Sequence, residues 1–219
     1  MGPPRCGRAG PWPVQLRHHT WLTSEQYVSE RGWLQASLKR CPSHPEGGCC
    51  FSRHGTYPRI EPPGMQVARW YCRDAHRTFS LLPDCMSSRL VGSLDEAEQV
   101  VVKVEESASV EVAAQALRPD IDVPGAIRWV RRRLQGVRAS LLILLTLLPG
   151  RLGSKAELLE ARRILETERC LVRLREIAAP HLQALPRPLG FRPWQRRTTE
   201  CDSRFQQKTG PDPPRDSRY

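Results

Sequence analysis

The sequence predicts an α+β fold in which a small three-stranded ribbon precedes an all-α part, with disordered termini. Two short β-prone runs, residues 52–60 and 65–72, flank the turn-forming pair Pro63-Gly64. From Ser93 onward, apolar residues recur at helical spacing. Both ends of the chain are rich in proline and arginine. We therefore expect residues 1–20 to be disordered and residues 180–219 to form a disordered basic tail.

The composition argues for small folded units. The chain has 219 residues, 20 prolines, a hydrophobic fraction of 39% and a formal net charge of +11. Globular domains usually contain roughly 45–50% apolar residues, so one large core over the whole length is not expected. No apolar run reaches the roughly 18–20 residues that a membrane span needs. The first residues also lack the apolar centre of a signal peptide. We expect a cytoplasmic protein with no membrane partner.

The first part of the chain predicts a helix followed by the ribbon. Thr23 and Gln26 have the spacing of a capping box, which predicts a helix within residues 21–40. Residues 41–92 form the ribbon, whose third strand is expected at residues 78–82. A unit of about 40 residues buries too little apolar surface to be stable without a disulfide or a metal ion.

A group of cysteine and histidine residues supplies a candidate metal site. Cys41 and His44 are separated by two residues, and Cys72 and His76 by three. Zn²⁺ takes four nitrogen or sulfur ligands in a tetrahedron, and its binding supplies folding free energy. We predict that Cys41, His44, Cys72 and His76 bind a structural zinc ion. Cys49 is an alternative to His44.

Catalysis is not expected at this site. A catalytic zinc keeps an open coordination position beside a positioned acid or base, and no such group is recognisable in the sequence. No third residue stands at a spacing that would orient a cysteine–histidine nucleophilic pair. We therefore predict that the protein is not an enzyme.

Residues 93–148 predict a helix-turn-helix with a long third helix. Ser93, Ser109 and Asp122 each precede a helical pattern as N-cap residues. In the third helix, apolar residues alternate at spacings of three and four from Ile127 to Leu148, which forms a seam over three heptads. A fourth helix is expected over residues 154–179. It packs back on the third as an antiparallel helical hairpin.

The charge of the helical part is segregated. Residues 94–127 carry two basic and eight acidic side chains, whereas residues 128–186 carry twelve and five. In a helix-turn-helix, the second helix enters the major groove of DNA, and the planar guanidinium of arginine binds phosphates and guanine edges. We therefore predict binding to double-stranded DNA. The expected contacts are Arg128, Arg131, Arg132 and Gln135 on one helix face, with Arg59 and Arg69 in the ribbon.

Residues 38–90 resemble the zinc ribbon of insertion-sequence transposases and of short bacterial transposase-like proteins of unknown function. The pairs Cys41-Pro42 and Tyr71-Cys72 and the run Arg77-Thr78-Phe79 match the family pattern. His44 and Ala75 stand where the family has its second and fourth cysteines. The resemblance implies a zinc-binding, DNA-binding protein related to transposases, with a second copy or a transposase as a possible protein partner.

A catalytic domain is not recognisable after the ribbon, because no segment beyond Ser93 alternates like the strands of a ribonuclease-H-like domain. The alternative function is a protein-interaction module, in which the helical hairpin of residues 127–178 pairs with a partner through its heptad seam.

Overall fold

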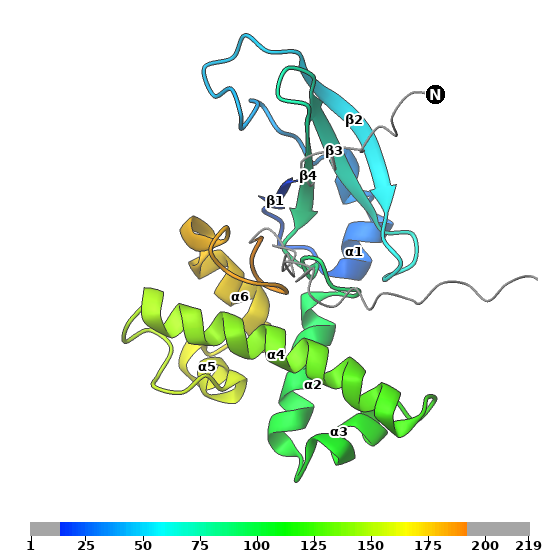
Figure 1. Cartoon of the computed structure of the whole chain (residues 1–219), viewed down its shortest axis with the longest axis vertical. Coiled ribbons are helices and arrows are strands. Elements are labelled where there is room, and N and C mark those ends of the chain that lie inside the picture. The colour runs from blue at the N-terminus through cyan, green and yellow to red at the C-terminus, as the bar shows by residue number, and fades with distance from the viewer. Residues whose placement is uncertain (1–13, 192–219) are drawn as a thin grey trace, which may run out of the picture.

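The computed structural model describes residues 14–191, with a four-stranded mixed sheet at one end and a group of helices at the other (Figure 1). The sheet order is β1-β4-β3-β2, with β1 parallel to β4 and the other pairs antiparallel. The strands are β1 (Val14–His18), β2 (Phe51–Pro58), β3 (Gln66–Cys72) and β4 (Arg77–Pro83). The class is α+β as predicted, but the sheet has four strands rather than three.

The additional strand, β1, lies in the stretch that the sequence predicted to be disordered. Val14 and Leu16 alternate along it and pack on the same apolar cluster as Phe79 and Leu81 of β4. The strand forms because of this tertiary contact, whose two sides, β1 and β4, are distant in the sequence. The remaining residues predicted to be disordered, 1–13 and 192–219, lie outside the described residues.

The two faces of the sheet differ in character. On one face, Trp70, Phe79 and Leu81 form an apolar cluster that is covered by side chains from residues 33–49. On the other face, Val67 and Leu82 join the helical core, and polar side chains occupy the rest of β3 and β4. The metal-site candidates belong to the first face.

The predicted N-terminal helix is shorter than residues 21–40. α1 (Ser24–Ser29) begins with the expected capping box, in which Thr23 Oγ1 accepts from the Gln26 backbone N–H and the Gln26 side chain accepts from the Thr23 backbone N–H. A 3₁₀ turn, η1 (Gly32–Leu34), follows. A Cβ atom on Gly32 would lie 2.5 Å from the ring of Tyr27, so only glycine allows this close packing. The helix therefore ends at Ser29, and the following turn packs Gly32 against the ring of Tyr27.

Three helices form where their N-cap residues predicted them. They are α2 (Leu94–Glu106), α3 (Val110–Leu117) and α4 (Val123–Leu147), and the side chains of Ser93, Ser109 and Asp122 accept the capping hydrogen bonds. α2 and α3 both pack against α4. The predicted seam of α4 is buried at Val130, Leu134, Val137, Leu141 and Leu144.

The predicted fourth helix, residues 154–179, is two helices. α5 (Leu158–Leu165) and α6 (Cys170–Ile177) are separated at Glu166, whose φ of 49° is left-handed and stops the helix. Both pack on α2 instead of forming a hairpin with α4. Backbone N–H groups at the start of both helices donate hydrogen bonds to acidic residues of α2, which are distant in the sequence.

Two glutamates of α2 satisfy the N-terminal N–H groups of these helices. The carboxylate of Glu105 accepts from the first two N–H groups of α5, both at 2.9 Å. The buried carboxylate of Glu98 accepts from the first two of α6, at 2.9 and 2.8 Å. Carboxylates are also favoured at this end of a helix by its dipole. Glu98 and Glu105 thus hold α6 and α5 in place.

We expect Glu98→Ala to lower the free energy of unfolding by about 2 kcal/mol, because two buried N–H groups lose their acceptor. Arg162, whose Nε lies 3.4 Å from the Glu98 carboxylate, would also lose an ionic contact. Urea denaturation measures the effect. Glu106→Ala is the matched control, because Glu106 is exposed on the same helix. Equal costs for the two variants would contradict the capping role.

The chain after α6 is ordered as far as Phe191, although the sequence predicted a disordered tail from residue 180. A 3₁₀ turn, η2 (Ala179–His181), leads into a segment whose Leu185, Leu189 and Phe191 are buried in the core. This segment crosses α4 at Gly136, where a Cβ atom would lie 2.8 Å from the Arg187 carbonyl oxygen. Its apolar residues, spaced between prolines, account for the order.

Arg175 of α6 joins this segment to the end of the sheet. Its side chain is fully buried, and it donates to the carbonyls of Asp84 (3.0 Å), Met86 (2.6 Å), Pro188 (2.6 Å) and Leu189 (2.9 Å). One side chain therefore connects three segments that are distant in sequence. None of the helices in residues 14–191 has the length and apolar character that a bilayer crossing requires.

Candidate metal centre

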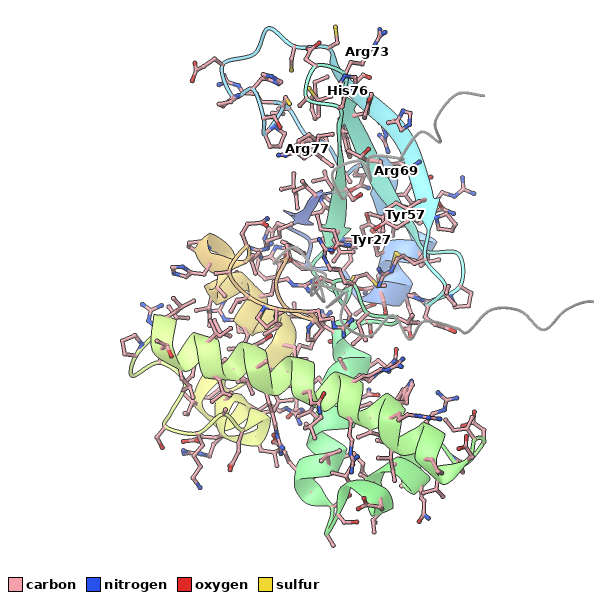
Figure 2. All side chains as sticks on the ribbon, viewed as in Figure 1. Tyr27, Tyr57, Arg69, Arg73, His76 and Arg77 are labelled. Carbon is pink, nitrogen blue, oxygen red and sulfur yellow. The ribbon has the colours of Figure 1, made fainter. Side chains whose placement is uncertain are left out.

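Four cysteine and histidine side chains meet at the end of the sheet that includes the β3–β4 turn, beside the labelled Arg73 and His76 in Figure 2. They are Cys41, His44, Cys49 and Cys72, and their ligand atoms all lie within 4.8 Å of one another. His44 Nδ1 is 3.6 Å from Cys41 Sγ and 3.5 Å from Cys72 Sγ. A sulfur at 2.3 Å and a nitrogen at 2.0–2.1 Å from a tetrahedral zinc are about 3.5 Å apart. The spacing fits such an ion.

Local turns bring three of these side chains together. The His44 backbone N–H donates to the Cys41 carbonyl at 3.1 Å and closes a tight turn. Gly47 and Gly48 have φ values of 90° and 78°, which L-residues rarely adopt, and they direct the chain back toward the cluster. Cys49 follows them immediately. The left-handed turn at these two glycines therefore places Cys49 next to His44.

The fourth side chain comes from the end of β3. The loop that contains Cys49 is fixed to this end by two hydrogen bonds, from the Cys50 N–H to Asp74 Oδ2 (2.8 Å) and from the Arg73 N–H to the Cys50 carbonyl (3.2 Å). These two bonds therefore hold the loop beside Cys72.

This group differs from the predicted one at a single position. Cys41, His44 and Cys72 are brought together as the sequence suggested. Cys49 and His44 are both present, whereas the sequence suggested one or the other, and His76 is not in the group. His76 is exposed, has a φ of 46°, and its Nδ1 lies 3.4 Å from the Tyr71 hydroxyl. The left-handed turn directs it to the other side of the strand end.

The three thiols of this group are close enough to affect one another's ionisation. Burial and the thiols of Cys41 and Cys72 raise the pKa of Cys49 to about 12. Burial also raises the pKa of Cys72, but an N–H donated by Ala75 (3.4 Å) and the neighbouring thiols outweigh it, so its pKa is lowered. Three thiolates this close repel one another, and a divalent cation removes the repulsion. The donor set is therefore suited to a metal ion.

The cluster is closed by the apolar face of the sheet. Cys41 and Cys72 are 3% and 0% exposed, and they pack with Trp70 and Phe79. Four protein ligands complete a tetrahedron and leave no position for substrate or water. The arrangement suits a structural metal rather than a catalytic one.

The residues predicted to contact DNA fall into two groups. On α4, Arg128, Arg131, Arg132 and Gln135 are all exposed. Arg131 has an exposed acidic neighbour, Glu111 of α3, at 3.9 Å. The helix face is therefore accessible and predominantly cationic.

The two ribbon arginines are less accessible. The Arg59 guanidinium donates to the carbonyls of Ser87 (3.0 Å) and Leu90 and is used within the fold. Arg69 is half-buried and lies over the ring of Tyr57, 5.8 Å from its centroid. Neither arginine projects freely from the surface, although charge alone made both of them candidates.

Sequence reasoning missed two features of this region. Cys49 belongs to the group together with His44, and the signal was the Gly47-Gly48 pair directly before it. Arg89, with a left-handed φ of 51°, lies beside Arg59 and Arg69 at a cavity that no sequence motif indicated.

Comparisons with protein-family models, curated proteins and solved structures found no match to the chain.

Proposed function

We propose that the chain is a zinc-stabilised protein that binds double-stranded DNA through the exposed face of α4. The observation that carries the zinc assignment is the set of four ligand atoms within 4.8 Å, with sulfur–nitrogen distances of 3.5 and 3.6 Å. Cysteine and histidine are the ligands that structural zinc sites use, and thiolates disfavour magnesium and calcium.

The role of the zinc is to hold the sheet together at its far end. The ion joins residues 41–49 to the end of β3, and those residues cover the apolar face that contains Trp70. Without it, the covering segment has few other fixed contacts, because residues 42–48 are mostly exposed or half-buried. The zinc thus substitutes for the core that so small a sheet lacks.

The DNA proposal is supported by the accessible charge of α4. Between residues 128 and 138 there are five arginines and no acidic residue. Four of them, Arg128, Arg131, Arg132 and Arg138, are exposed. α3 and the turn before α4 have the order of a helix-turn-helix, in which the beginning of the second helix enters the groove. The resemblance to transposase zinc ribbons favours the same proposal. In this proposal the chain is a relative of transposases without a recognisable catalytic domain.

Three of the acidic residues before α4 do not oppose this proposal, because they are used inside the protein. Asp95 accepts two hydrogen bonds from Arg169 at 3.1 Å. Glu98 and Glu105 bind the N-termini of α6 and α5. All three carboxylates are therefore engaged by groups of the helical part.

The alternative, a protein-interaction module that uses the seam of residues 127–178, is disfavoured. The central residues of the seam, including Leu134, Val137 and Leu141, are buried against the chain's own helices and C-terminal segment. A partner could reach them only if these elements separated, which would expose the largest core of the protein.

A salt titration of DNA binding tests the proposal. If α4 neutralises about three or four phosphates, log K falls against log salt concentration with a slope of about −3 to −4, at about −0.9 per phosphate. Arg128→Gln and Arg132→Gln are each expected to reduce the slope by about 1, measured by fluorescence anisotropy with a labelled duplex. Arg163→Gln, at an exposed position on α5, is the control and leaves the slope unchanged. Binding that does not depend on salt would contradict the proposal.

A further inference from the structure

A cavity of about 490 Å³ lies on the polar face of the sheet, opposite the face that carries Cys72 and Trp70. Three of its lining residues are arginines, namely Arg59, Arg69 and Arg89. Gln15, Thr78 and Ser80 add an amide and two hydroxyl groups. Its lining contains no acidic side chain. The cavity is therefore cationic and rich in hydrogen-bond donors.

The sheet itself arranges part of this lining. Ser80 of β4 pairs with Gln15 of β1 on one side and with Arg69 of β3 on the other. Directly paired residues project from the same face of a sheet, so these three side chains form one row across it. Arg89 comes from the loop between β4 and α2, and its φ of 51° is a conformation that non-glycine residues seldom adopt.

Two buried donors in this cavity lack a partner. Among residues 14–191, the buried Nε atoms of Arg69 and Arg89 have no hydrogen-bond acceptor. Neither guanidinium forms an ion pair within the same range. The buried amide of Gln15 is also unpartnered at Oε1, and exchange of its oxygen and nitrogen positions would place two further N–H donors there.

Unpaired, partly buried charges are unfavourable unless an opposite charge is supplied. Glu61 lines an adjoining cavity with Arg59 and Arg89, but within the described chain it forms no ion pair with either. The missing partner is therefore an anion with several acceptor oxygens. Arginine binds phosphate through two parallel N–H···O bonds, and serine and threonine hydroxyls complete such sites.

We propose that this cavity binds a phosphate group through Arg69, Arg89 and the row formed by Gln15 and Ser80. The cavity is larger than one phosphate ion, and the ring of Tyr57 lies in its wall beneath Arg69. The phosphate is therefore part of a larger molecule, either a free phosphorylated compound or a nucleic-acid strand. The site does not depend on DNA binding by α4, since it uses different residues. Figure 2 shows Tyr57 and Arg69 together on the sheet, away from α4.

The first test is thermal unfolding of the full zinc-loaded chain in chloride, inorganic phosphate and pyrophosphate at matched ionic strength. Phosphate and pyrophosphate are expected to raise Tm in a saturable manner, because a ligand that binds only the folded state stabilises it. Arg69→Gln and Arg89→Gln are each expected to weaken phosphate binding by about tenfold or more. Arg151→Gln, at an exposed loop position, is the control. The absence of a phosphate-specific shift in the parent, or an unchanged shift in both variants, overturns the proposal.

The variants carry a second readout that separates binding from folding. In chloride alone, Arg69→Gln is expected to be about as stable as the parent, because the Arg69 guanidinium forms no ion pair within residues 14–191 and the variant loses only its contact with the Tyr57 ring. Arg69→Lys keeps the charge but loses the planar fork, and it is expected to bind phosphate with intermediate affinity. If Arg69→Gln proves unstable in chloride, Arg89→Gln and Arg69→Lys decide the question by the same criterion.

A second arm identifies the source of the phosphate and separates this site from the proposed function. If a strand phosphate occupies the site, Arg69→Gln weakens binding of a DNA oligonucleotide as well as of phosphate. If a free compound occupies it, the same variant loses phosphate binding while the DNA binding that depends on Arg128 is unchanged. Either result supports the site. Failure of DNA binding by α4, with the phosphate shift intact, would remove only the proposed function.

Discussion

Cys72→Ser is expected to lose zinc and to lower the Tm of the protein by at least about 10 °C, because metal-linked folding free energy amounts to several kcal/mol. Cys72 is fully buried between the loop of residues 41–49 and the apolar face of the sheet. Its loss would separate the two parts that the proposed ion joins. A chelator applied to the parent is expected to have the same effect, measured by circular dichroism during heating.

Two further variants make this result specific. Cys50→Ser is the matched control, because Cys50 is exposed, adjacent to Cys49 and outside the ligand group. It is expected to keep its zinc and its Tm. His44→Ala is expected to lose zinc affinity, whereas His76→Ala is not. Retention of zinc by Cys49→Ser together with its loss in His76→Ala would contradict the ligand set.

Arg175→Met is expected to lower the free energy of unfolding by about 3–5 kcal/mol, since removal of one member of a buried polar network leaves its partners unsatisfied. Methionine fills a similar volume but donates no hydrogen bonds. The carbonyls of Asp84, Met86, Pro188 and Leu189 would all lose a donor. The effect is measured by urea denaturation, with the slope checked against that of the parent.

The control for this variant is Arg173→Met on the same helix. Arg173 is about half exposed, and within residues 14–191 it pairs only with Glu176, one turn away, so its loss is expected to cost at most about 1 kcal/mol. Burial lowers the pKa of Arg175 to about 10, with Asp84 opposing the shift, so the side chain remains charged at neutral pH. Similar costs for Arg175→Met and Arg173→Met would show that the buried contacts do not hold the three segments together.

The features that the sequence predicted well are local. Thr23, Ser93, Ser109 and Asp122 each cap a helix through an N–H only three residues away, so the signal and its partner lie in one short stretch. The seam of α4 is equally local, because its spacing depends only on the helical period. Cys41 and His44 belong to this group too, since a single tight turn joins them.

The features that it missed depend on distant contacts. The Glu98 carboxylate that starts α6 is 72 residues from Cys170, and β1 pairs with a strand more than 60 residues away. No short window contains both halves of such an interaction. The exchange of His76 for Cys49 has the same origin, because a left-handed turn at His76 and the return of the loop at Gly47-Gly48 are set by the fold around them.

Charge was also a poor guide to accessibility in the sheet. Arg59 and Arg69 looked like the arginines of α4 in the sequence, yet they line a cavity with Arg89, whereas Arg128 and Arg132 are exposed to solvent. Burial decides whether an arginine binds a surface partner or a ligand in a cavity, and burial depends on tertiary packing. For this reason we treat the two sets of arginines as separate sites.

Zinc K-edge X-ray absorption on the full purified chain tests the central claim most directly. We predict about one zinc ion per chain with three sulfur ligands at about 2.3 Å and one nitrogen ligand at about 2.0 Å. These ligands correspond to Cys41, Cys49, Cys72 and His44. A shell of two sulfurs and two nitrogens would restore His76 as a ligand in place of Cys49. That result would contradict the metal centre described for this protein.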